Sequence, residues 1–169
     1  MFTRPHASDA SQVVDLIKEA FSYSPDTGAL YRNGRIAGGR STGGYLRVQF
    51  MSKTFSVHRI AWLLVTGAWP AGEIDHINGV RTDNRLSNLR DVSRSINAQN
   101  KGSALRSNST SDCLGVNRHV SYGRRFRAQI WRDGKNHHIG YFDTAEAAHE
   151  AYLSAKFECH PGFVLERFV

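Results

Sequence analysis

Apolar positions recur at helical spacing in two segments near the start of the chain. In residues 9–20 they include Val13 and Ile17 on one face, with polar side chains opposite, which predicts an amphipathic helix. Residues 58–66 are mostly apolar and are followed by Gly67, a residue type that commonly ends helices. We therefore expect one surface helix and one buried helix in this part of the chain.

Short alternating segments lie between these two helices. Residues 45–50 alternate apolar and polar side chains, and residues 54–57 continue the pattern after a break short enough for a tight turn. Residues 21–23 and 30–32 lie on either side of an Asp-Thr-Gly turn signal. Together the four segments predict a small antiparallel sheet that carries arginine side chains.

The pattern restarts after a polar stretch, residues 101–112, that has almost no apolar side chains. Three segments beyond it, residues 115–118, 125–131 and 136–142, have the composition of short strands, with an Asp-Gly turn between the last two. Thr144 is then the expected cap of a helix with an alanine-rich face. The pattern predicts a three-stranded antiparallel sheet packed on one helix.

These elements predict an α+β fold with two domains. The N-terminal domain, residues 1–100, combines the small antiparallel sheet with a compact core at about residues 73–100, and residues 113–169 follow the linker as the C-terminal domain. The 169 residues are 40% hydrophobic and 22% charged, which is typical of globular proteins. Without an apolar stretch of about 18 residues or a signal-like start, we expect a soluble, cytoplasmic protein.

The chain has a formal charge of +7, and 17 of its 22 basic residues are arginine. Residues 27–72 and 113–132 contain no acidic side chain, so positive charge is gathered in two tracts. This distribution predicts that the protein has two surfaces that contact one long polyanion, because the guanidinium fork suits phosphates and guanine edges. Charge alone fits a solvated basic surface equally well. The DNA-binding candidates of the first tract are Arg32, Arg35, Arg40, Arg47 and Lys53.

Residues 73–100 contain an acid, a histidine and several carboxamides. Asp75 and His76 are adjacent, so on an extended strand their side chains point to opposite faces and have different tasks. Histidine accepts a proton near neutral pH, whereas carboxylate and carboxamide oxygens bind hard divalent ions. Asn97, on a helix predicted at residues 94–101, adds such an oxygen. Asp75 and Asn97, with waters and a phosphate, suit Mg²⁺.

This segment resembles the HNH endonucleases, specifically the phage and intron-encoded homing type, in which a β-hairpin and a helix hold one metal ion (a ββα-metal core). The matching residues are Asp75-His76, Asn88 in the returning strand and Asn97 on the helix. The resemblance implies that His76 is the general base, that Asp75 and Asn97 bind one Mg²⁺ or Mn²⁺, and that Asn88 orients His76. Asn97 stands where many members have the final histidine, which makes this an H-N-N variant.

Alternative interpretations remain for several of these residues. His58 at a helix start fits a packing role or a phosphate contact better than catalysis, and Arg90 fits phosphate binding or a salt bridge equally well. A purely structural interpretation makes the asparagines turn formers and lets His76 pack. The spacing argues against it, since Asn88 and Asn97 follow His76 at 12 and 21 residues.

Residues 114–157 are similar to the Apetala/ethylene-response-factor type of DNA-binding domain. The segments that carry the similarity are Gly115-Val116, residues 126–130, residues 139–144 and Ala151-Tyr152. The resemblance implies that the three-stranded sheet enters the major groove with the helix behind it. The DNA-contact candidates it implies are Arg118, Arg125, Arg127, Trp131, Arg132 and Lys135.

Taken together, the sequence predicts a metal-dependent, site-specific DNA endonuclease of a bacterial or phage-infected host cell. Its partner would be double-stranded DNA, with no membrane and no protein partner implied. One metal ion and one base per chain predict that a monomer nicks a single strand. The competing hypothesis is a non-catalytic, sequence-specific DNA-binding regulator with a relic HNH segment.

Overall fold

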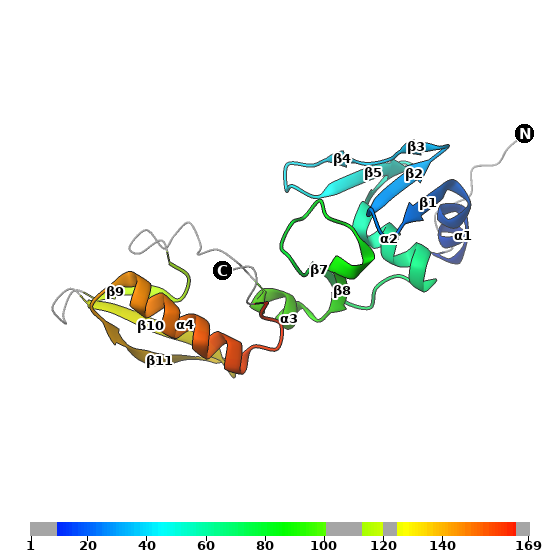
Figure 1. Ribbon diagram of the computed structural model, residues 1–169. Helices are drawn as coiled ribbons and strands as arrows, with labels where there is room; N and C mark the ends of the chain where they lie inside the picture. Colours follow the sequence, from blue (N-terminus) through cyan, green and yellow to red (C-terminus); the bar gives the residue numbers. More distant parts are fainter. Residues whose placement is uncertain (1–9, 101–112, 120–124, 165–169) are drawn as a thin grey trace, which may run out of the picture. The chain divides into compact units, whose positions relative to one another are not determined.

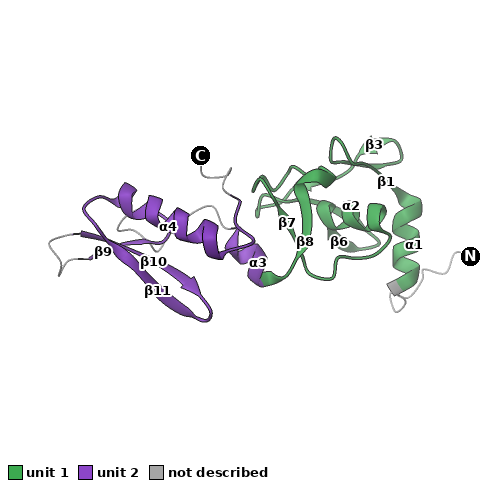
Figure 2. Ribbon diagram, turned by 60° about the horizontal axis from the view of Figure 1, so that its bottom comes forward, with its two compact units in different colours: residues 1–94 green, residues 95–169 purple. Residues whose placement is uncertain are grey.

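The computed structural model describes residues 10–100, 113–119 and 125–164 (Figure 1). The chain forms two compact units, residues 1–94 and 95–169, whose boundary falls inside a helix (Figure 2). The predicted linker at residues 101–112 and the first residue of the predicted N-terminal helix, Asp9, lie outside the described residues. The overall class is α+β with several small antiparallel sheets, which confirms the prediction.

Unit 1 begins with a helix and a first small sheet. The helix α1 (Ala10–Ala20) leads directly into a sheet with the strand order β1 (Phe21–Ser24), β2 (Ala29–Arg32) and β3 (Arg35–Ile36). Between β2 and β3, Asn33 and Gly34 both have positive φ, as a tight two-residue hairpin turn requires.

A second three-stranded sheet follows, so the one sheet predicted for this region is divided into two. Its strands are β4 (Gly39–Arg40), β5 (Leu46–Phe50) and β6 (Lys53–Ser56), and β6 runs directly into α2 (Val57–Thr66). The division occurs at Gly38, which has φ +112° and lies so close to Val57 that a Cβ would be 2.8 Å from its Cγ2. The chain therefore leaves the first sheet there instead of extending it.

The buried helix α2 joins the two cores of unit 1. One of its sides packs with Ile17, Leu30 and their neighbours in the larger core. Ala61 packs instead with Ile74 and Leu89 in a smaller core. Because Ile74 immediately precedes the predicted catalytic dipeptide, α2 fixes that dipeptide against the N-terminal sheets.

The predicted hairpin and helix of residues 73–100 are present. β7 (Glu73–His76) pairs antiparallel with β8 (Leu89–Val92), and a 3₁₀ turn, η1 (Leu86–Asn88), leads into β8. The short helix α3 (Arg94–Gln99) follows, and only its first residue belongs to unit 1.

Unit 2 contains a three-stranded antiparallel sheet and one long helix, as predicted. The strands β9 (Val116–His119), β10 (Arg125–Arg132) and β11 (Lys135–Phe142) have β10 in the centre, and α4 (Ala145–Cys159) packs on one face. Thr144 caps α4 by accepting a hydrogen bond from the amide of Ala147. In the part of the chain that the structure describes, no helix has the length and apolarity needed to cross a membrane.

Candidate active site

Asp75 and His76 form the last two positions of β7 and are both buried. The register pairs Asp75 with Arg90 and His76 with Leu89 on β8. Arg90 donates two hydrogen bonds to Asp75 Oδ2, from Nε at 2.9 Å and from Nη2 at 2.7 Å. Of the two roles open for Arg90, the structure contains the salt bridge, which holds the Asp75 carboxylate in one orientation.

The His76 ring is enclosed by two other rings. His58 on α2 meets it edge-on with ring centroids 5.1 Å apart, and the Tyr45 ring lies at 5.8 Å. Its Nε2 is hydrogen-bonded to Asn84 Oδ1 at 3.0 Å. Burial lowers the pKa of His76, while the hydrogen bond with Asn84 and the charge of Asp75 act in the opposite direction. The neutral ring that results near pH 7 is the form able to accept a proton.

His58 occupies the interior of the same cluster. Burial, assisted by the neighbouring His76, lowers the pKa of His58 to about 4. Its ring also packs against Tyr45 at a centroid distance of 5.3 Å. With only 8% of its surface exposed, His58 has the packing role that the sequence favoured over catalysis.

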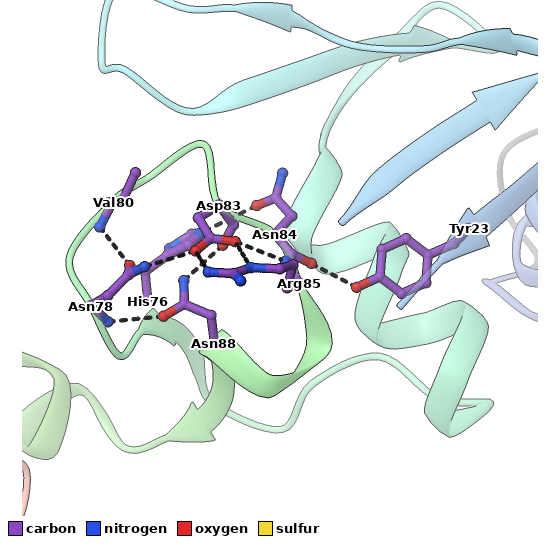
Figure 3. A network of polar contacts seen from close by, with 8 residues as sticks. All are labelled: Tyr23, His76, Asn78, Val80, Asp83, Asn84, Arg85 and Asn88. Atoms are coloured by element: carbon purple, nitrogen blue, oxygen red, sulfur yellow. Dashed lines mark hydrogen bonds and ion pairs between the residues drawn. The ribbon is translucent and has the colours of Figure 1, made fainter. Parts of the chain in front are cut away.

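The loop between β7 and η1 is closed by a polar network (Figure 3). Asn78 donates from Nδ2 to Asp83 Oδ2 at 2.7 Å, and Arg85 binds both carboxylate oxygens of Asp83. Arg85, assisted by Asn78, holds the pKa of Asp83 at about 2. Asn88 joins the two ends of the loop, because its Oδ1 accepts from the Asn78 amide and its Nδ2 donates to the Asp83 carbonyl.

Asn84 is the residue that the sequence analysis missed. The resemblance implied that Asn88 orients His76, but the side-chain hydrogen bonds of Asn88 go to the main chain of the loop, and the carboxamide bonded to the His76 ring is that of Asn84 (Figure 3). The Asp-Asn-Arg sequence around Asn84 looks like a turn. Only its 1% exposure, which depends on tertiary packing, distinguishes Asn84 from an ordinary turn residue.

Asn97 lies on α3, within unit 2. The helix is held by the segment that follows α4, where the Gly162 amide donates to Gln99 Oε1 at 3.0 Å. A Cβ at Gly162 would overlap the main-chain oxygen of Ile96. The predicted metal ligand is therefore carried by a helix that packs with the C-terminal unit. No residue of α3 is buried.

The DNA-binding candidates of unit 1 lie on exposed positions of the two small sheets. All five are strand residues: Arg32, Arg35, Arg40, Arg47 and Lys53. The Arg32 guanidinium lies over two aromatic rings, 5.7 Å from the centroid of Phe21 and 5.1 Å from that of Phe50.

The candidates of unit 2 divide between the two faces of its sheet. Arg125, Arg127 and Trp131 alternate with the buried Ala128 and Ile130, which places them on the face opposite α4. Trp131 is 60% exposed there.

The other three candidates follow the opposite alternation. Arg118 pairs with Phe126, which packs into the core under α4, so Arg118 belongs to the helix side of the sheet. Arg132 and Lys135 pair across the end of the β10–β11 hairpin, and both are exposed.

Comparison with known proteins agrees with this geometry. Residues 55–99 match the family model described as HNH endonuclease. The matched segment is similar to an HNH endonuclease domain. It includes β7, β8, α2 and α3, and with them Asp75, His76, Asn88 and Asn97.

One solved structure is also similar to the chain, that described as "DNA binding and cleavage by the HNH homing endonuclease I-HmuI". The similarity covers 77% of this chain and 75% of that chain, with 23% sequence identity and a TM-score of 0.41. No curated protein matches the sequence.

Proposed function

We propose that this protein is a metal-dependent, site-specific DNA endonuclease that hydrolyses one phosphodiester bond and nicks one strand as a monomer. The observation that carries the proposal is the position of His76 at the end of β7 in the HNH segment, buried and hydrogen-bonded through Nε2. A histidine held in this way suits general-base chemistry better than surface binding.

In this proposal His76 takes a proton from the water that attacks phosphorus. The lowered pKa keeps the ring unprotonated before the reaction. The rings of His58 and Tyr45 restrict its rotation, so the accepting nitrogen has a fixed direction. Asn88 contributes by closing the loop that begins at Ile77, whose amide donates to the Asn88 carbonyl.

The proposed metal ligands are Asp75 and Asn97. Their oxygens are hard donors of the kind that Mg²⁺ and Mn²⁺ prefer, so the donor chemistry fits a hydrated divalent ion. Both hydrogen bonds from Arg90 end on the same oxygen of Asp75, Oδ2. When bound, such an ion would stabilise negative charge on the phosphate and the leaving oxygen. Among the described residues, no group of three or more His, Cys, Asp and Glu side chains could hold a metal.

Double-stranded DNA is the proposed substrate, and unit 2 is the proposed source of sequence preference. Its sheet presents Arg125, Arg127 and Trp131 on the face that α4 leaves uncovered. This arrangement supports the interpretation of unit 2 as a DNA-binding domain of the Apetala/ethylene-response-factor type. The proposed location is the cytoplasm of a bacterial or phage-infected host cell.

A plasmid assay tests the proposal directly. Supercoiled DNA incubated with the protein and Mg²⁺ should be converted to the nicked circle, and EDTA should abolish the reaction. DNA binding without cleavage at any Mg²⁺ or Mn²⁺ concentration would favour the competing hypothesis, a DNA-binding regulator. Undiminished cleavage in EDTA would contradict the metal role of Asp75 and Asn97.

A further inference from the structure

The β1–β2 hairpin is in contact at three points with the end of the loop between β7 and η1 and with the start of η1. The Tyr23 hydroxyl donates to the main-chain oxygen of Asn84 at 2.6 Å (Figure 3), and the Leu86 amide donates to the Pro25 carbonyl at 3.0 Å. Gly28 is packed so closely that a Cβ would lie 2.5 Å from the Arg85 nitrogen. The first sheet, which precedes the family match at residues 55–99, thus fixes the main chain of the loop.

Asn84 connects this contact to the active site. It is 1% exposed, and its Oδ1 lies 3.0 Å from His76 Nε2. Its Nδ2 is buried and has no hydrogen-bond partner among the described residues. The side chain therefore makes a single hydrogen bond in the described structure, and that bond is to the His76 ring.

We propose that the β1–β2 hairpin is a positioning element of the active site. Tyr23 and Gly28 hold the Asn84 main chain, and Asn84 Oδ1 accepts a hydrogen bond from the Nε2–H of His76. The proton-accepting atom is then Nδ1. This inference rests on the proposed function, because it assigns the tautomer of the proposed base.

The chemistry of the groups supports this assignment. A carboxamide oxygen only accepts hydrogen bonds, so a ring nitrogen facing it must carry the proton. A neutral imidazole has one N–H, which leaves the lone pair on the other nitrogen. Burial raises the pKa of Tyr23 to about 12, with the charges of Asp83 and Asp26 acting in the same direction, so its hydroxyl stays a donor to Asn84.

The chain offers matched pairs of variants for a test. Tyr23→Phe removes the hydroxyl that binds Asn84, whereas Tyr31→Phe makes the same change at a half-buried position on β2. Gly28→Ala and Gly34→Ala both place a methyl group at φ +72°, but the space around Gly34 is empty within 4 Å. Asn84→Ala removes the hydrogen bond to His76 itself.

The first measurement uses the full chain without metal or DNA. Long-range ¹H–¹⁵N NMR of the neutral His76 ring reports which nitrogen carries the proton. We expect the Nε2–H tautomer in the wild type and in Tyr31→Phe and Gly34→Ala. Asn84→Ala should give a mixture of the two tautomers. Tyr23→Phe and Gly28→Ala should also increase the population of the Nδ1–H tautomer.

The second measurement is single-turnover nicking of DNA that is already bound. We expect a loss of about 10²-fold for Asn84→Ala, since a displacement of about 1 Å in a reacting group has an effect of this size. The nicking rate of Tyr23→Phe and Gly28→Ala should fall further than that of their controls, with DNA affinity unchanged. Should Asn84→Ala fail to fold, these two variants still decide the question.

An Nδ1–H tautomer in the wild type would overturn the inference, as would variants that behave like their controls in both measurements. The NMR comparison needs no cleavage, so a wild-type protein that does not cut DNA would count against the endonuclease proposal alone. In that case the tautomer of His76 would still support or overturn the role of the hairpin.

Discussion

The β7–β8 hairpin and α3 both carry proposed catalytic side chains, but different surroundings hold them. Asp75 and His76 are buried in unit 1, with an ion pair to Arg90 and a hydrogen bond to Asn84. Asn97 lies on a six-residue helix without buried residues, held within unit 2 through Gln99. The proposed base is therefore positioned by its own unit, whereas the proposed second metal ligand depends on the C-terminal unit.

The largest expected effect is at the base. His76→Ala should reduce nicking by about 10²–10⁴-fold, the usual contribution of a general base, while DNA affinity changes little. Quantifying supercoiled and nicked plasmid over time measures the loss. His149→Ala is the control and should cut at the wild-type rate, because His149 is on α4, on the other side of the unit 2 sheet from the proposed DNA-contact face. A His76→Ala protein that nicks normally would mean that another group is the base.

A smaller loss is expected where α3 meets the C-terminal segment. Gly162→Ala places a methyl group against the main chain of Ile96, so α3 must move, and nicking should fall by about 10–10²-fold. Mn²⁺ binding followed by electron paramagnetic resonance should weaken in parallel. Gly134→Ala adds the same methyl group in open space at φ +77° and is a stringent control. If the two variants nick DNA and bind Mn²⁺ equally well, the position of Asn97 does not depend on its packing in unit 2.

The smallest effect concerns stability in acid. Burial lowers the pKa of His58 to about 4, below the roughly 6.5 of an unfolded histidine. Between these values the unfolded chain binds more protons, so the free energy of unfolding falls as pH drops from about 6.5 to 4. Urea titrations at pH 7 and 5, followed by NMR signals of α2, should show a lower midpoint at pH 5. His58→Leu should reduce the difference between the two midpoints. An unchanged difference would mean that the protonation of His58 is not its cause.

Local signals were sufficient to predict most elements of both units. The alternation at residues 125–131, the Asp-Gly turn and the Thr144 cap each depend on neighbours in sequence, and the structure has all three. The sequence also predicted that Asp75 and His76 lie on a strand, where adjacent side chains face opposite sides. The structure places both residues at the end of β7.

The missed features depend on contacts between distant residues. Asn84 is bonded to His76 through its side chain and to Tyr23, 61 residues earlier, through its main-chain oxygen, and no local pattern reports either bond. The boundary between the compact units likewise falls inside α3, where the sequence shows no change of composition. Gly162 binds Gln99, 63 residues before it, so that most of α3 belongs to unit 2.

The most direct test of the account compares DNA affinity with single-turnover nicking in two variants. In Arg125→Ala/Arg127→Ala, site-specific binding should weaken by about 1–3 kcal/mol per lost guanine contact, with less salt dependence and nearly unchanged nicking of bound DNA. Asp75→Ala should abolish nicking and keep most of the affinity. The opposite pattern, or loss of both properties in both variants, would contradict a division between catalysis by the HNH segment and sequence recognition by the sheet of unit 2.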